Sequence, residues 1–160
     1  MPSEVLLRRV FDELIPARAD ADPQVNWQGV SLRRYQGKIY ALQEKPVASW
    51  EMRWDLTGEL SLPNQLGSLR FTREKPQHNY LALPLGCVEV TLRSHSENVK
   101  LELSAGRRKT LSKWLKEKGV PPWQRQNLPF VFTSDSLLGV PGLIAVDVEQ
   151  AAGYLVWVKD

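Results

Sequence analysis

From Gly106 to Phe130 the chain reads GRRKTLSKWLKEKGVPPWQRQNLPF, a basic segment that runs into a rigid Pro-Pro-Trp turn. Seven Lys or Arg residues and one Glu lie between Arg107 and Arg125, so this segment carries a charge of +6. The whole chain carries only +3, and the remaining residues therefore sum to −3. Positive charge concentrated on a mildly acidic body is typical of a surface that binds phosphate groups.

The spacing of apolar residues predicts a short amphipathic helix in this segment. At about 100° per residue, one helix face is apolar and is expected to pack inward. That face is formed by Leu111, Trp114 and Leu115. A stripe of lysines is expected directly opposite, formed by Lys109, Lys113 and Lys116. Gly119 is expected to end the helix, because glycine is the usual residue at a helix C-terminus.

The first turn of the predicted helix holds Arg107, Arg108 and Lys109, where the helix dipole and the free backbone N–H groups favour an anion. The outward face has almost no acidic residue for i,i+4 pairing, which favours RNA binding. An ordinary solvated surface is the alternative interpretation, since many surface helices carry lysine opposite an apolar face. Beyond the helix, Trp123 either packs against it or offers a stacking face, and Arg125 either joins the phosphate surface or is a plain surface cation.

Several motifs resemble the C-terminal domain of bacterial tRNA(Ile)-lysidine synthase. The most specific is Gly119-Val120-Pro121-Pro122-Trp123-x-Arg125. Further matching residues are spread over most of the chain: Leu32-Arg33-Arg34-Tyr35, Leu62-Pro63, Leu66-Gly67, Gly106-Arg107-Arg108-Lys109, Leu111, Lys113-Trp114, Leu128-Pro129 and Leu155-Val156-Trp157. Thr110 and Ser112 depart from a family pattern that is usually more basic at these positions.

The resemblance implies an ATP-dependent ligase that attaches lysine to the wobble cytidine of an isoleucine tRNA with the anticodon CAU. In that family the chemistry lies in an N-terminal domain, where a Ser-Gly-Gly-x-Asp-Ser loop holds ATP, with magnesium and lysine also expected there. No such loop occurs in this sequence. The resemblance therefore implies a tRNA-binding fragment that is inactive alone, contains no cofactor and belongs to a cytoplasmic enzyme. By position it assigns tRNA contacts to Arg107, Arg108, Lys109, Lys113, Lys116 and Arg125.

The remaining sequence predicts an α+β fold of mostly short antiparallel strands with an N-terminal helix and the basic helix. A hairpin is expected over Val30–Gln43, closed by Gln36-Gly37. Further strands are expected at Trp50–Trp54, Ser68–Thr72, Cys87–Arg93, Asn98–Leu103, Phe130–Thr133, Leu137–Val140, Leu143–Val146 and Tyr154–Val158. With the resemblance, this divides the chain into residues 1–64, the end of a substrate-binding domain, and residues 65–160, a C-terminal tRNA-binding domain.

The N-terminal helix is expected to run from Glu4 to about Leu14. Its predicted buried face is formed by Leu7, Val10, Phe11 and Leu14. Because the helix begins almost at Met1 with nothing before it to pack against, we expect the protein to extend further upstream.

One face of the hairpin carries alternating cations and aromatic rings: Arg33, Tyr35, Lys38 and Tyr40. Such pairs either stabilise a plain sheet or stack on a nucleic-acid base, and the sequence leaves both interpretations open.

Little in the chain points to catalysis or to a membrane. No run of 18 apolar residues and no signal-peptide pattern is present. His78 and His95 lie in polar segments without a Cys, Asp or second His at metal or triad spacing. The lone Cys87 is interpreted as a small buried hydrophobe, and Asp20-Ala21-Asp22-Pro23 as a turn. We predict no catalytic residue and no metal site.

Two hypotheses from different classes remain. The first is a tRNA-holding module of a ligase, in which another domain performs the chemistry. The second is a protein-interaction module that docks a neighbouring domain or a second copy, as in a homodimer, with lysines that only solubilise it. The two differ in whether binding depends on salt and on the lysines.

Overall fold

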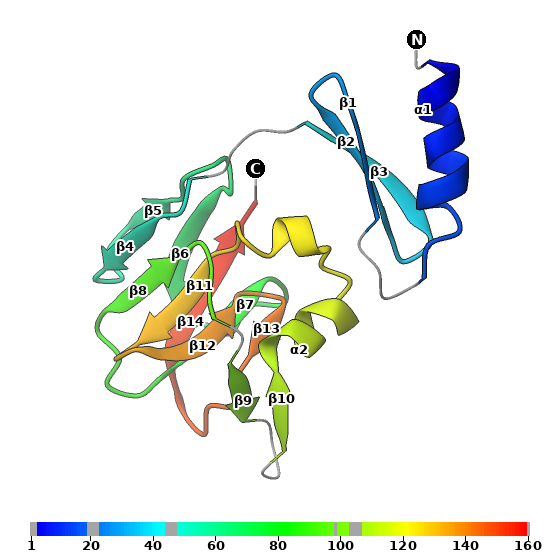
Figure 1. Cartoon of the computed structure of the whole chain (residues 1–160). Coiled ribbons are helices and arrows are strands. Elements are labelled where there is room, and N and C mark those ends of the chain that lie inside the picture. The colour runs from blue at the N-terminus through cyan, green and yellow to red at the C-terminus, as the bar shows by residue number, and fades with distance from the viewer. Residues whose placement is uncertain (1–2, 19–22, 44–47, 98, 103–106, 160) are drawn as a thin grey trace. The chain divides into compact units, whose positions relative to one another are not determined.

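The computed structural model describes residues 3–18, 23–43, 48–97, 99–102 and 107–159 (Figure 1). The chain divides into two compact units, Met1–Pro46 and Val47–Asp160. Each unit has its own cluster of buried apolar residues.

The first unit combines a helix with a three-stranded antiparallel sheet. Its elements are α1 (Glu4–Arg9), a π-helical turn (Val10–Leu14), β1 (Gln24–Trp27), β2 (Val30–Tyr35) and β3 (Lys38–Gln43), with the strand order β1-β2-β3. Gln36 and Gly37 both have positive φ, 47° and 77°, as a two-residue hairpin turn requires. Arg33 pairs with Tyr40 and Tyr35 with Lys38, so the predicted hairpin and its register are confirmed.

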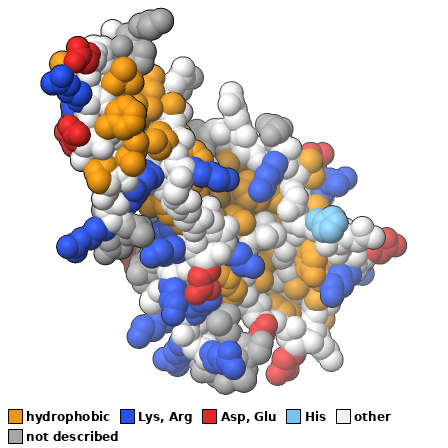
Figure 2. All heavy atoms as spheres, turned by 90° about the vertical axis from the view of Figure 1, so that its right-hand side faces the viewer, with side chains coloured by type: hydrophobic (Ala, Val, Ile, Leu, Met, Phe, Trp, Pro, Cys, Tyr) orange, Lys and Arg blue, Asp and Glu red, His pale blue; other side chains and the backbone are white. Residues whose placement is uncertain are grey.

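The buried face of the first helix agrees only in part with the predicted one: Leu14 is buried and Val10 packs partly buried beside it, as predicted. Leu6 and Leu14 are buried, whereas Leu7 and Phe11 are 47% and 65% exposed. The helix changes to π geometry after Arg9, where the Ile15 N–H donates to the Val10 carbonyl, five residues back, at 3.0 Å. This wider turn changes the direction of residues after Arg9, such as Phe11, whereas the burial of Leu6 in place of Leu7 occurs in the α-helical part before it. Figure 2 shows apolar side chains gathered on the surface of this unit.

The second unit is built from two antiparallel sheets. The five-stranded sheet has the order β13-β12-β11-β8-β4, and the four-stranded sheet has the order β5-β6-β14-β7. Their strands are β4 (Glu51–Trp54), β5 (Glu59–Ser61), β6 (Ser68–Thr72), β7 (Tyr80–Pro84), β8 (Val90–Arg93), β11 (Phe130–Thr133), β12 (Ser136–Val140), β13 (Ile144–Ala145) and β14 (Ala151–Val158).

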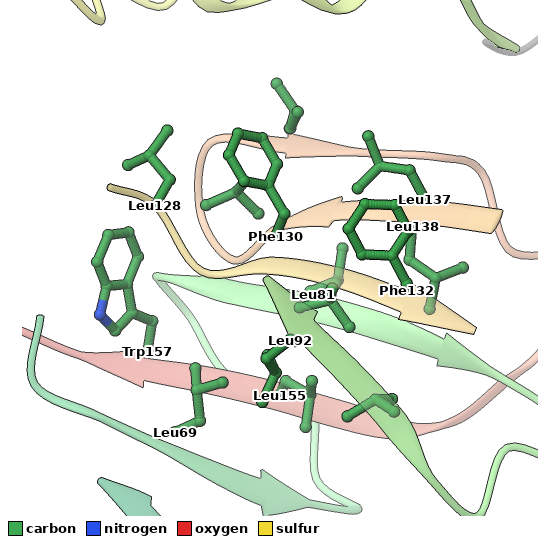
Figure 3. Packing of buried hydrophobic residues seen from close by; sticks show 14 of the residues in the cluster. Leu69, Leu81, Leu92, Leu128, Phe130, Phe132, Leu137, Leu138, Leu155 and Trp157 are labelled. Atoms are coloured by element: carbon green, nitrogen blue, oxygen red, sulfur yellow. The ribbon is translucent and has the colours of Figure 1, made fainter. Parts of the chain in front are cut away.

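Apolar side chains of both sheets meet in one core (Figure 3). Burial alternates along β14: Gly153, Leu155 and Trp157 are buried, and Tyr154 and Val156 between them are only partly buried. This is expected for a strand with one face on a core. Phe130 on β11 is 1% exposed and belongs to the same cluster. The predicted α+β fold with mostly antiparallel strands is therefore confirmed.

The structure places the boundary between units earlier than the sequence predicted. Division at residues 64 and 65 would separate β4 and β5 from the sheets to which they pair. Trp54 and Leu62 also belong to the core of the second unit. The chain instead divides at Pro46 and Val47, because the hydrogen bonds and apolar contacts of residues 48–64 are made with the second unit.

Some strand limits also differ. The strand expected from Cys87 begins at Val90, because the Cys87 N–H donates to the Pro84 carbonyl in a turn at 3.2 Å. The sequence did not predict β1, β5 or β7. Asn98 and Leu103, the expected ends of another strand, lie outside the described residues.

Candidate nucleic-acid interface

The basic segment folds as a two-stranded ribbon followed by a helix: β9 (Lys100–Glu102), β10 (Arg108–Thr110) and α2 (Leu111–Glu117). The helix begins at Leu111, because the Thr110 side chain caps it by accepting a hydrogen bond from the Lys113 N–H at 3.3 Å. Arg108 and Lys109 are therefore strand residues, and Arg107 precedes the strand. The prediction that these three cations occupy the first helical turn is wrong.

The pairing of the ribbon separates its cations. Lys109 pairs with Leu101 and Thr110 with Lys100. Because successive side chains on a strand point to opposite faces, Arg108 and Lys100 lie on one face of the ribbon, and Lys109 shares the other with the buried Leu101.

Lys109 is held within the structure and does not join an outward stripe. Its ammonium group pairs with the Glu117 carboxylate and lies 5.9 Å from the centre of the Trp114 ring. Its side chain is only 22% exposed. The predicted stripe thus loses one member, while Lys113 and Lys116 are exposed on the helix as expected.

The apolar face of α2 agrees with the prediction. Leu111 and Leu115 are buried in the core of the second unit, and Trp114 packs half-buried beside them. Gly119, with φ of 74°, follows the helix, and the Val120 N–H returns to the Leu115 carbonyl at 3.0 Å.

The Pro-Pro-Trp segment forms a 3₁₀ turn, Pro122–Gln124. Trp123 is half-buried there. Arg125 donates from Nε to the Val120 carbonyl at 2.9 Å and is also half-buried, so it supports this turn.

We refer to five exposed cations on the ribbon, just before β10 and on the helix as the basic surface: Lys100, Arg107, Arg108, Lys113 and Lys116. Lys118, directly after α2, is also exposed. Lys and Arg side chains gather on the corresponding face in Figure 2. Sequence reasoning missed Lys100, which reaches this surface only through pairing of β9 with β10. Recognising a hairpin on either side of residues 103–106 would have located it.

Glu117, which pairs with Lys109, is one carboxylate beside the basic surface. The hydrogen bond from Lys109 is the main cause that lowers the pKa of the Glu117 carboxyl, and the charges of Lys109, Lys113 and Lys118 act in the same direction. Glu117 is therefore ionised at neutral pH. Because its pKa is lowered on folding, the stability that this ion pair contributes is present at neutral pH and is lost as the pH falls through the lowered pKa.

The Cys87 thiol is not activated, and the described ligating side chains form no metal-binding cluster. Burial raises the pKa of the Cys87 thiol, and the hydrogen bond to the Glu89 carbonyl opposes this only in part. The raised pKa disfavours the reactive thiolate. Within the described parts of the chain, His, Cys, Asp and Glu side chains form no group of three that could hold a metal ion. Among those same residues, no helix is both long and apolar enough to cross a bilayer.

Two family models match the chain. The TilS substrate binding domain matches residues 1–40, and the TilS substrate C-terminal domain matches residues 88–157. The chain belongs to the TilS family. The two TilS matches fall in the first and second compact units respectively.

Similar full-length proteins carry the name tRNA(Ile)-lysidine synthase. The one from Photobacterium profundum is 32% identical over 92% of this chain, and the one from Proteus mirabilis is 31% identical over 86%. The synthase from Coxiella burnetii is 27% identical over 96% of the chain. The chain spans only 34%, 32% and 34% of the lengths of these relatives.

A crystal structure of a TilS C-terminal domain has the same fold, with a TM-score of 0.50 at 20% identity. The match covers 66% of this chain and 93% of that domain. The family matches confirm the resemblance drawn from the sequence motifs, and the structural match shows a shared fold.

Proposed function

We propose that this chain is the tRNA-holding part of a tRNA(Ile)-lysidine synthase. The parent enzyme would be a cytoplasmic ligase that uses ATP with magnesium to attach lysine to the wobble cytidine of an isoleucine tRNA with the anticodon CAU. A separate catalytic domain would bind ATP and lysine, and this chain alone would be inactive. Its contribution would be affinity and register, because contacts to phosphate position an RNA without reading its sequence.

The observation that supports this proposal is the placement of the basic surface on one continuous element. Strand β10 leads directly into α2, and both carry exposed cations. Duplex RNA is recognised chiefly through its shape and backbone, for which such a surface is suited. Among the six residues that the resemblance assigned to tRNA contact, Arg107, Arg108, Lys113 and Lys116 are exposed and suit this role. Lys109 and Arg125 are only partly exposed, so we propose that they position the element.

Removing three of the exposed cations should weaken tRNA binding and its dependence on salt. If four or five cations each neutralise one phosphate, log K should fall against log salt with a slope of about −3 to −5, at micromolar or poorer affinity. The variant Arg108→Ala, Lys113→Ala, Lys116→Ala should flatten that slope by about 2 to 3. Fluorescence anisotropy of labelled tRNA across a salt series measures both quantities.

The matched control is Arg53→Ala, Arg70→Ala, Arg73→Ala, which removes the same charge from exposed positions elsewhere on the second unit. Its slope should stay within about 1 of the unchanged chain. Equal flattening by both variants would mean that only net charge matters. The protein-interaction module would be supported if the chain bound no tRNA and instead bound a second copy or a neighbouring domain with an affinity that does not depend on salt. A homodimer is one form of such a module.

Neutralising Glu117 should act in the opposite direction. Glu117→Gln removes the negative charge beside Lys109 and Lys113, so tRNA affinity at low salt should rise about twofold to fivefold. The control Glu89→Gln changes an exposed carboxylate in the loop before β8, away from α2, and should leave affinity unchanged. The same anisotropy assay tests both, and weaker binding by Glu117→Gln would show that its pairing with Lys109 is needed to hold the surface in shape.

A further inference from the structure

Two hollows lie next to each other on the second unit. The first has a volume of about 510 Å³ and is lined by both Trp123 and Trp157, with the amides of Gln65, Gln124 and Asn127. The second has a volume of about 520 Å³ and is lined by Tyr80, Trp114 and His78, with the amides of Gln77 and Asn79. Each is within the usual size range of a small-ligand site.

Lys118 and Leu143 line both hollows, so the two are separated by these side chains. The Trp157 N–H donates to the Asn79 carbonyl at 2.9 Å, which ties a residue of the first hollow to one of the second. A second exposed lysine, Lys159, lines the first hollow, and its ammonium group lies 4.5 Å from the centre of the Trp157 ring. Along the surface, Lys118 thus lies between the first aromatic hollow and the second.

The charge of these hollows distinguishes them from others on the same unit. No Asp or Glu is among the described residues that line either one. Three further hollows all contain carboxylates: one is lined by Glu51, Glu97 and Asp135, one by Glu89 and Asp135, and one by Asp135 and Asp147. Trp123 in the first hollow, and Tyr80 and Trp114 in the second, are partly exposed and can accept bases by stacking, whereas Trp157 is only 5% exposed and belongs to the core. Side-chain amides can bond to base edges, and a lysine that lines both hollows matches a linking phosphate.

We propose that these two hollows bind two consecutive unpaired nucleotides of an RNA strand, with Lys118 at the phosphate that joins them. This inference rests on the proposed RNA-binding function and adds a second mode of contact. The basic surface holds a duplex through its backbone, whereas the hollows hold bases that no partner strand covers. Lys118 follows α2 directly, so a strand leaving the duplex could pass from one region to the other.

The test compares two RNA hairpins binding to the 160-residue chain: a blunt one and the same one with a single-stranded extension of about four nucleotides, enough to span both hollows. The extension should tighten binding about tenfold. Lys118→Ala should abolish that gain and weaken binding of the blunt hairpin by no more than Lys113→Ala does. Lys113→Ala, the matched control on the basic surface, should weaken both hairpins by the same factor. A 2-aminopurine in the extension should lose fluorescence on binding, as stacking on a ring requires.

The outcomes separate this inference from the proposed function. Salt-dependent binding of the blunt hairpin with no gain from the extension would overturn the inference and leave the proposed function intact. Binding of the isolated single-stranded extension without the blunt hairpin would support the hollows and contradict the duplex surface. Failure of the chain to bind the blunt hairpin, the extended hairpin and the isolated extension would overturn both this inference and the proposed function, and would favour a protein occupant.

Discussion

Replacing Gly139 by alanine should lower the free energy of unfolding of the second unit by at least about 3 kcal/mol. Gly139 lies on β12 with φ of 142°, a conformation that other residues rarely adopt. An added Cβ would lie 2.1 Å from the backbone oxygen of Ile144 and 2.9 Å from the Cα of Ala145. Because both atoms belong to the backbone of β13, the clash can be relieved only by separating the two strands. Urea unfolding followed by tryptophan fluorescence measures the change.

Gly58→Ala is the matched control for this substitution. Gly58 also has positive φ, 67°, but an added Cβ would meet nothing within 4 Å. Its replacement should cost only about 1 kcal/mol, the conformational strain alone. Equal losses for the two variants would show that β12 and β13 can separate without consequence for the rest of the sheet.

The second large effect is expected in the first unit, where Leu14→Ala should unfold the unit while the second stays folded. Leu14 is fully buried, and only Leu6 and Val25 share its degree of burial among the described residues of that core. Truncating a buried leucine costs about 2 to 5 kcal/mol, which is large for so small a core. Hydrogen exchange should show lost protection for the amides of β1, β2 and β3 and retained protection in β14.

Phe11→Ala provides the comparison, since Phe11 is 65% exposed and its loss should change stability by no more than about 0.5 kcal/mol. Simultaneous loss of protection in both units on Leu14→Ala would contradict the division at Pro46 and Val47. A large effect of Phe11→Ala would mean that its ring is covered by another part of the protein.

Local patterns predicted the parts of the fold that depend on neighbouring residues. Gln36-Gly37 indicated a two-residue turn, and such a turn sets the register of its hairpin, so Arg33 opposite Tyr40 followed directly. Leu111 and Leu115 were correctly placed on a buried helix face. The motif from Gly119 to Arg125, with the further motifs along the chain, indicated the TilS family, because residue order is specific without any tertiary contact.

Competing local signals misled the prediction at the start of α2. Arg107 to Lys109 are good helix formers, and the lysine spacing suited a helix from that point. Pairing with β9 supplies their backbone hydrogen bonds instead, and Thr110 then caps the helix. The interaction of Lys109 with Glu117 follows from this strand geometry, so the residue assigned to the outward stripe faces a carboxylate.

The sequence by itself determined the α+β class, the hairpin, the apolar face of α2, the concentration of positive charge and the family. Only the tertiary structure decided which cations are exposed, how β4 and β5 join the second unit, and that Lys118 lies between two aromatic hollows. The physical reason is the range of the interactions. Turns, caps and helix faces depend on residues a few positions apart, whereas exposure, strand pairing and hollows depend on residues such as Asn79, Lys118 and Trp157 that meet only after folding.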